Sequence, residues 1–330
     1  MADQQISNLQ VKSFGQNFYT NVELAGGKLR DKVTLVGSQF GTMPYRESGI
    51  YPVFGGGGLP TERKTRFGDS PVSEADYGNR KVTRSFFDDG FFVDWQDIEQ
   101  IAVDLKAPKM QNSMNKFRRQ EDLILMKAAL GAAMGGVKGD TSTAFDTSNV
   151  VPVTTGATSG NAGMNYAKFL ALKDSLASAD VDIEYGPKPV MVMSPQQYYL
   201  ELYNDDKFIN SGYYKFAQAQ AGSQIVNFMD VTIVVMNNCP YLNTAGTGVD
   251  TDDAWTSTGT ATDYDSTDIR ACFAFMPDSL MLEIAPEVTA EIDKRADKGF
   301  NYYAYIKMGL GAVRMEEAKV WLVPCDQSPA

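Results

Sequence analysis

The first 95 residues of this chain cannot form a hydrophobic core by themselves. Residues 1–44 are polar and irregular, and their apolar runs, such as Val33–Val36, are short and follow no sustained period. Residues 45–95 are interrupted by Gly55–Gly58 and by Pro60, which break regular elements. The stability of this region must therefore come from packing against the rest of the chain or against another molecule.

A strand-like run at residues 80–87 predicts a hairpin within this region. Asp88-Asp89-Gly90 is a turn signal, and the apolar residues 91–95 follow it. We expect residues 45–95 to form a long β-hairpin excursion with a glycine-rich tip or shoulder. Because an isolated hairpin is marginally stable in water, it should lean on a neighbouring surface.

The strongest helix signal lies at residues 113–135. Ser113 is a suitable N-cap, Pro108 stands ahead of it, and Gly135-Gly136 should end the helix. Polar residues crowd the first turns, whereas apolar residues cover nearly the whole circumference of the second half. We therefore expect the second half of the helix to be buried.

The rest of the chain alternates helices and short strands. Expected helices lie at residues 166–177 and 196–203, the second opened by Ser194-Pro195. Polar loops are expected at residues 137–163 and at the Asp-rich segment 243–268. The expected strands are residues 190–193, 231–236, 271–275, 280–284, 302–307 and 319–323. The predicted fold class is α+β with mixed sheets.

The chain contains no histidine, and this absence removes several classes of reaction. Without imidazole there is no Ser-His-Asp or Cys-His nucleophilic pair and no histidine metal ligand. Lys and Arg number 30 against 41 Asp and Glu, so the net charge is −11. Tight binding of nucleic-acid phosphate, which needs clustered basic residues, is therefore not expected.

The cysteines and the apolar stretches predict where the protein is made. Cys239, Cys272 and Cys325 lack the short spacing of zinc or redox sites, so we expect buried thiols and synthesis in a reducing cytoplasm. The N-terminus has no signal-peptide pattern, and the longest apolar stretch, residues 123–134, is short of the roughly 20 residues that span a bilayer. We expect a soluble protein without membrane contact.

Two local patterns partly match a catalytic motif and a calcium-binding loop. Ser113 and Lys116 fit the S-x-x-K pattern of serine acyl-enzymes, but the companion S-D-N and K-T-G patterns are absent. A Ser/Lys hydrolase is kept as a minor alternative. The Asp-rich segment 243–268 lacks the glycine and the closing glutamate of a calcium loop. We therefore expect no cofactor, no metal site and no enzyme activity.

Pairs of adjacent aromatic residues recur along the chain. Neighbouring residues of a strand point to opposite faces, so an aromatic pair indicates a sheet that is covered on both sides. We expect one side to face the core and the other to face a neighbouring subunit. The pairs are Phe86-Phe87, Phe91-Phe92, Tyr198-Tyr199, Tyr213-Tyr214 and Tyr302-Tyr303.

The order of these elements resembles the major capsid proteins of tailed bacteriophages, the Hong Kong 97-type fold, and among them the podovirus-like members. The resemblance extends over residues 45–323. Residues 91–101 resemble the end of the extended loop and the segment that returns from it, and residues 113–134 resemble the spine helix. Residues 190–200 with 205–208 resemble the strand–Ser-Pro–helix unit of the axial domain, and residues 228–240 resemble its next strand. Residues 309–314 and 318–322 resemble the closing strands of the peripheral domain.

The resemblance implies a division of the chain into five parts. These are residues 1–44 as an N-terminal arm, 45–95 as an extended loop, 96–160 as a peripheral domain with the spine helix at 113–135, 161–270 as an axial domain, and 271–330 as a C-terminal return to the peripheral domain. The arm and the loop would lie across adjacent subunits. Six basic loop residues would form intersubunit ion pairs: Arg63, Lys64, Arg66, Arg80, Lys81 and Arg84.

The resemblance also implies a function and partners. The chain would self-assemble as hexamers and pentamers into an icosahedral shell around the genome of a tailed dsDNA phage. A scaffolding protein and a portal would be partners, and contact with the packaged DNA would be weak and non-specific. The protein would be made in the host cytoplasm and reside in the virion. A cellular nanocompartment shell of the same fold is the alternative, and the Lys–Asn cross-link of some family members stays open.

Overall fold

The structure of the protein is a computed structural model. Most of the predicted arm, the tip of the predicted hairpin and the Asp-rich segment lie outside the residues that it describes. The described residues are 28–29, 32–35, 48–54, 62, 77–93, 106–136, 138–157, 160–179, 181, 183, 186–209, 227–237, 239–242, 269–284 and 289–327.

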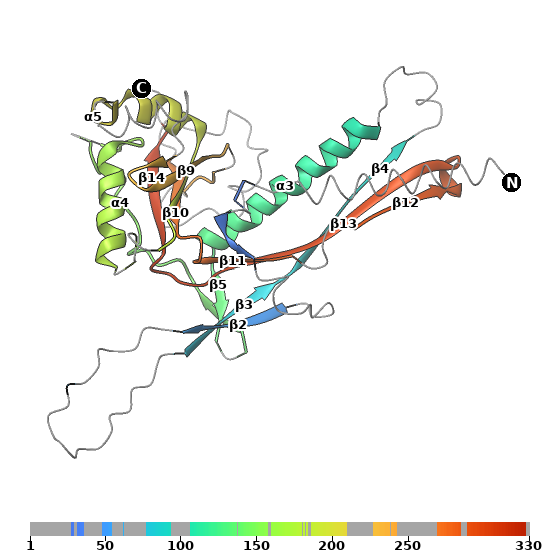
Figure 1. Cartoon of the computed structure of the whole chain (residues 1–330), viewed down its shortest axis with the longest axis horizontal. Coiled ribbons are helices and arrows are strands. Elements are labelled where there is room, and N and C mark those ends of the chain that lie inside the picture. The colour runs from blue at the N-terminus through green and yellow to red at the C-terminus, as the bar shows by residue number, and fades with distance from the viewer. Residues whose placement is uncertain are drawn as a thin grey trace, which may run out of the picture.

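A long, thin sheet, here called the elongated sheet, runs through one half of the molecule (Figure 1). Its central strand β13 (Asn301–Arg314) pairs antiparallel with β4 (Ser85–Val93) along one edge. Along the other edge it pairs with β12 (Thr289–Arg295) and β11 (Leu280–Ile284), and the short β1 (Thr34–Leu35) lies parallel to β11. One strand of 14 residues therefore holds the sheet together.

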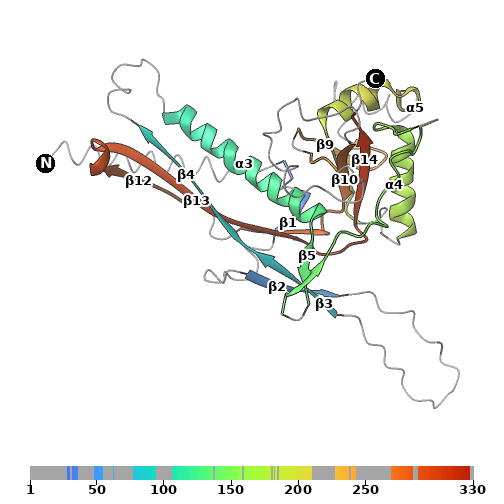
Figure 2. The ribbon, with the colours of Figure 1, turned by 180° about the vertical axis from the view of Figure 1, so that it is seen from behind.

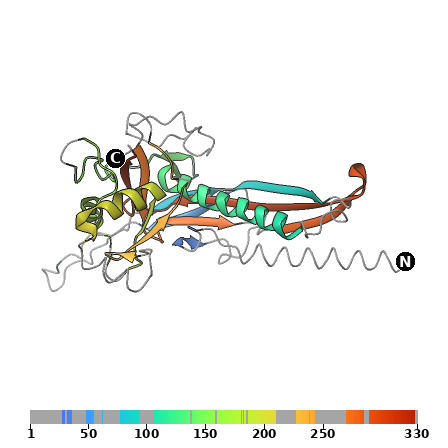
Figure 3. The ribbon, with the colours of Figure 1, turned by 90° about the horizontal axis from the view of Figure 1, so that it is seen from above.

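Helix α3 (Lys106–Leu130) lies along one face of the elongated sheet (Figure 3). Its buried apolar residues join the core that the sheet contributes, and most of them lie in the second half of the helix, as predicted. They are Phe117, Leu125, Met126, Ala129 and Leu130.

The helix begins and ends earlier than the predicted residues 113–135. Pro108 lies in its first turn, where a missing amide hydrogen is tolerated, and Ser113 lies inside the helix rather than at its N-cap. Residues Ala133–Gly135 form strand β5 because they pair with the hairpin strand that lies beside them. A tertiary pairing thus ends the helix before the glycine pair is reached.

The predicted hairpin is present, but its turn is not at Asp88-Asp89-Gly90. Strands β2 (Ser48–Phe54) and β3 (Tyr77–Thr83) pair antiparallel, and they project from the body of the molecule (Figure 2). The chain then passes through Arg84 directly into β4. The turn prediction was wrong because Asp88–Gly90 lies within the nine-residue pairing of β4 with β13, which outweighs the local turn preference.

The hairpin crosses the elongated sheet at a glycine. A Cβ atom on Gly311 of β13 would lie 2.7 Å from Val82 Cγ1 and 2.8 Å from the carbonyl oxygen of Thr83. Both neighbours belong to β3, which passes over β13 at this position. Gly311 therefore allows the backbones of β3 and β13 to approach closely.

A second sheet forms a compact lobe with strand order β14-β10-β7-β9-β8. The helices α4 (Tyr166–Ser178), η2 (Gln197–Glu201), η3 (Leu202–Asn204) and α5 (Asp206–Ile209) belong to this lobe. The strands are β7 (Val190–Met193), β8 (Asn227–Phe228), β9 (Val231–Val235), β10 (Ile269–Phe275) and β14 (Val320–Asp326). The strands predicted at residues 190–193, 231–236 and 271–275 are confirmed.

Both faces of the compact sheet are covered. Along β10, Phe273 and Phe275 pack into the core shared with α3 and the elongated sheet, whereas Cys272 and Ala274 pack into a second core beneath α4. This alternation is the two-residue period of a strand with apolar residues on both faces. The core that contains Phe273 and Phe275 is therefore shared by the two halves of the molecule.

A lysine buried inside the compact lobe is also hydrogen-bonded. Lys168 of α4 is fully buried and donates to the carbonyl oxygens of Ala162 and Pro324, at 2.7 Å each. Burial lowers the pKa of this lysine.

The three cysteines are free and buried, as predicted. None of the described helices is long and apolar enough to cross a membrane.

The crossing at Gly311 can be tested by a single methyl group. Gly311→Ala should lower the free energy of unfolding by about 2 kcal/mol, because the methyl group meets the backbone of β3, which cannot rotate away. Urea denaturation of the purified chain measures the change. Gly78→Ala in β3 is the matched control, because a Cβ there meets nothing nearer than 3.9 Å. Equal effects of the two substitutions would contradict the crossing.

Candidate assembly surfaces

One face of the elongated sheet carries aromatic rings that α3 does not cover. On β4, Phe87 and Phe91 pack against the core, whereas Phe86 and Phe92 are 67% and 41% exposed. On β4 the predicted alternation is thus present, with one ring of each of its two pairs facing inward. Tyr198-Tyr199 instead lies in the helical segment η2, so the expectation of a strand was wrong for that pair. Because large exposed apolar groups mark contact surfaces, this face is a candidate for contact with another molecule.

The row of aromatic rings continues from β4 onto β13, where the rings are partly buried. The Phe92 ring lies 4.6 Å from that of Tyr303, and the Tyr303 ring stacks on that of Tyr305 with centroids 6.3 Å apart. Tyr303 lies over Gly90, where any side chain would collide with its ring. We call the set Phe86, Phe92, Tyr303 and Tyr305 the outer aromatic face.

The opposite side of β4 is attached to α3 by a carboxylate. Asp89 accepts a hydrogen bond of 2.8 Å from Ser113 Oγ and one of 2.8 Å from Lys116 Nζ. The S-x-x-K pair therefore serves as the docking point of the helix. Ser113 and Lys116 both donate to Asp89, so each contacts β4 through the same carboxylate.

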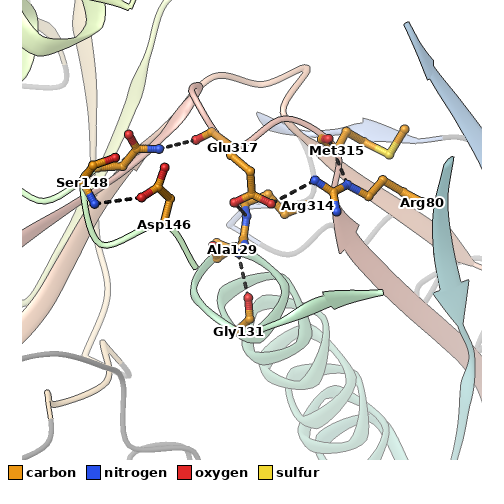
Figure 4. Close-up of polar contacts among 9 residues, drawn as sticks. Arg80, Ala129, Gly131, Asp146, Ser148, Arg314, Met315 and Glu317 are labelled. Atoms are coloured by element: carbon orange, nitrogen blue, oxygen red, sulfur yellow. Dashed lines mark hydrogen bonds and ion pairs between the residues drawn. The ribbon is translucent and has the colours of Figure 1, made fainter. Parts of the chain in front are cut away.

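A second polar contact caps the C-terminal end of α3. Arg314 of β13 is fully buried, and its Nη1 donates to the carbonyl oxygens of Ala129 and Gly131 at 2.8 and 2.7 Å (Figure 4). These carbonyls are among those that a helix end leaves without an internal partner. A cation at this end is also favoured by the helix dipole. The Nε of Arg314 donates to Glu317 Oε2 at 2.6 Å.

Glu317 connects this cap to the hairpin. Its Oε1 accepts a hydrogen bond of 3.0 Å from Arg80 Nη2, and Arg80 Nε also donates to the carbonyl oxygen of Met315 (Figure 4). The backbone oxygen of Glu317 accepts from the side-chain amide of Asn149. One residue thus joins β3, β13, the end of α3 and the segment that leads to the compact lobe.

A buried ion pair fixes the point where the hairpin joins the sheet. Arg84, between β3 and β4, pairs with Glu283 of β11, and both side chains are about 5% exposed. The Tyr51 hydroxyl of β2 donates to Glu283. Burial, followed by the charge of Glu283, raises the pKa of Tyr51 to about 12. The base of the hairpin is therefore held by charge as well as by the close crossing at Gly311.

These contacts place three of the six predicted intersubunit residues. Arg80 and Arg84 bind carboxylates of their own chain. The stem of Lys81 lies beside Gly139, where a Cβ would collide with it. The other three, Arg63, Lys64 and Arg66, lie outside the described residues. Whether the six residues bind a neighbouring subunit stays a prediction, and for Arg80 and Arg84 such binding would be in addition to an internal pair.

Sequence reasoning missed the acidic partners, Glu283, Glu317 and Asp89. One signal was available for Arg84, because it lies two residues after the apolar Val82, and side chains two residues apart in an extended chain point to the same face. A charged residue on a buried face needs a partner of opposite charge. No local pattern identifies that partner, because Glu283 is 199 residues away in the chain.

The comparisons with known proteins place the chain in a family. Residues 6–327 match the family described as phage capsid protein, so the chain belongs to the phage capsid protein family. The chain is therefore a phage capsid protein. Capsid membership makes it a structural protein of the virion shell. A comparison with curated proteins gives no match.

Several solved phage capsids resemble the chain. The capsid of Ralstonia phage GP4 has a TM-score of 0.64 at 10% identity, over 93% of this chain and 92% of that one. The capsid of cyanophage P-SCSP1u has a TM-score of 0.60 at 13% identity, over 91% and 88%. The mature capsid of bacteriophage PhiM1 has a TM-score of 0.56 at 14% identity, over 92% and 88%. The mixed α/β fold is thus that of phage capsid proteins.

The role of Glu317 can be tested against the glutamate beside it. Glu317→Gln should lower the free energy of unfolding by about 2–3 kcal/mol, because the buried charge of Arg314 loses its counter-ion. Glu316→Gln should change it by less than about 0.5 kcal/mol, because Glu316 forms an exposed pair with Lys319. Chemical denaturation of both variants measures the difference. Similar losses of unfolding free energy in the two variants would contradict the role of Glu317 in joining Arg314 to Arg80.

The environment of Tyr51 predicts a pH dependence. The folded-state pKa of about 12 lies above the ordinary value of 10.0, so folding favours the protonated phenol. This contribution is complete below the ordinary pKa and is lost as the pH rises through the folded-state pKa. The free energy of unfolding should therefore fall more steeply between these two pKa values in the wild type than in Tyr51→Phe. Parallel slopes for the two proteins would contradict the contact with Glu283.

Proposed function

We propose that the chain is a Hong Kong 97-type major capsid protein that assembles as hexamers and pentamers into an icosahedral shell around a dsDNA genome. The observation that carries this proposal is the outer aromatic face. A sheet with core on one face and exposed rings on the other is suited to a subunit whose second face is covered on assembly. Membership of the phage capsid protein family supports a capsid as the assembled product.

The parts of the fold correspond to the parts of that subunit. The β2–β3 hairpin is the base of the extended loop at residues 45–95, and α3 is the spine helix of the peripheral domain at 96–160. The compact lobe is the axial domain at 161–270, whose sheet is completed by β10 and β14 from the chain beyond that boundary. Strands β11, β12 and β13 are the return at 271–330. The described part of the proposed arm at 1–44 is attached to its own subunit, because Leu29 and Val33 are buried in the core and β1 pairs with β11.

The hairpin reaches a neighbouring subunit because its base is rigid. Arg80, Arg84 and Gly311 hold it to the body at three points. A hairpin that leaves the body in a fixed direction can place its loop on an adjacent subunit without losing entropy on each contact. The basic residues Arg63, Lys64, Arg66 and Lys81 then supply ion pairs that are weak singly and repeat in every copy.

The remaining partners follow from the same proposal. A scaffolding protein guides assembly, a portal occupies one vertex, and the packaged DNA touches the wall weakly. The net charge of −11 favours this last point, because an acidic wall does not bind phosphate tightly. The protein is synthesised in the host cytoplasm before it enters the virion.

Two adjacent phenylalanines test the outer aromatic face. Phe86→Ser should change the free energy of unfolding of the subunit by less than about 0.5 kcal/mol, because the ring is exposed, yet it should reduce the yield of shells. Phe87→Ser should destabilise the subunit by about 3 kcal/mol, because that ring packs on the core. Denaturation measures the first quantity, and sedimentation with negative-stain microscopy measures the second. Full shell yield from Phe86→Ser would contradict a covered outer face.

A further inference from the structure

The tip of the hairpin formed by β12 and β13 carries an aromatic ring in an unfavourable position. Phe300 is 69% exposed, and no hydrophobic cluster of the described residues includes it. Its φ of 61° lies in the left-handed region, which bulky side chains rarely adopt. Gly299 before it has a φ of 64°, where glycine meets no steric cost. Glycine or asparagine would suit position 300 better than phenylalanine.

A comparison within the chain shows that this position is unusual. Met229, in the turn between β8 and β9, is the other large apolar residue with positive φ among the described residues. Its side chain packs against the core of the compact lobe, so burial compensates the strained backbone there. Phe300 has no such compensation within the described part of the subunit. A strained residue that persists at a surface is grounds for a functional hypothesis.

The ring is also held in a defined place. The amide of Phe300 donates to the carbonyl oxygen of Arg295 at 3.0 Å, and Arg295 pairs with Asn301 in the register of the two strands. An ion pair of 3.2 Å between Arg295 and Asp297 spans the turn. The tip lies at the end of the elongated sheet that is remote from the compact lobe (Figures 1 and 3). Phe300 is therefore presented away from the body on a hydrogen-bonded turn.

We propose that Phe300 is an anchor that inserts into a second copy of this chain during shell assembly. This inference rests on the proposed function, since it names the residue through which copies meet. The charges around the ring favour a second copy over a polyanion. Asp293 and Asp297 lie beside Arg295 and Lys298, so both signs are present and neighbouring copies can complement one another. An apolar centre with a charged rim is the composition of a protein–protein contact.

The proposal predicts opposite effects on stability and on assembly. Phe300→Asn should raise or preserve the melting temperature of the unassembled subunit, because asparagine tolerates positive φ. The same variant should raise the protein concentration needed for shell formation by about tenfold, as expected for loss of an aromatic anchor. Phe300→Leu keeps an apolar side chain and should fall between the wild type and Phe300→Asn. Light scattering with sedimentation of the full chain, together with any scaffolding protein it requires, measures this order.

Two further readouts decide the outcome. If Phe300→Asn assembles like the wild type, or if it melts lower than the wild type, the anchor proposal is overturned. Benzoylphenylalanine placed at position 300 should give, on illumination of shells, a cross-linked band of two copies of the chain. A band with another protein, or none, overturns the proposal as well. Failure of the wild type to form shells would instead refute the proposed function, so the two failures are distinguishable.

Discussion

The antiparallel pairing of β13 with three other strands is the constraint on which the rest of the structure depends. Along its length, Ala304, Ile306 and Met308 are buried on the side that faces α3, whereas Tyr303 and Tyr305 lie on the other side. The same strand therefore fixes both the core and the surface left for a partner. Without it, β4 and β12 would lose the one strand that pairs with them among the described residues, β11 would keep only the short β1, and α3 would have no sheet to cover.

Three carboxylates then connect the parts that β13 brings together. Asp89 holds α3 to β4, Glu283 holds Arg84 at the base of the hairpin, and Glu317 joins the hairpin to the end of α3. Each has two oxygens, so Asp89 binds two donors of α3, and Glu317 binds Arg80 of β3 and Arg314 of β13. In a chain with an excess of acidic residues, these few are distinguished by position. They lie where separate elements of the fold meet.

Prediction from sequence worked where one strand or helix carries its own signal. Strands at residues 190–193 and 231–236 are short apolar runs bounded by polar or turn residues, and both are present. It failed where a distant partner decides. Asp88-Asp89-Gly90 is a turn by composition, yet it is strand because β13 pairs with it. Strand β12 was missed because its residues are mostly polar, and it forms by pairing with β13. The docking role of Ser113 and Lys116 needed Asp89, which no local pattern connects to them.

The sequence alone determined the kind of subunit. The first 95 residues cannot form a core by themselves, the aromatic pairs of residues 86–92 mark a strand with rings on both faces, and the absence of histidine removes imidazole chemistry. Those are properties of composition and short-range periodicity, which a linear chain already contains. Only the tertiary structure decided which ring of each pair stays exposed, which glycine allows the hairpin to cross, and which acids hold Arg80, Arg84 and Arg314. These depend on contacts between residues up to 237 positions apart, and such contacts exist only after the chain has folded.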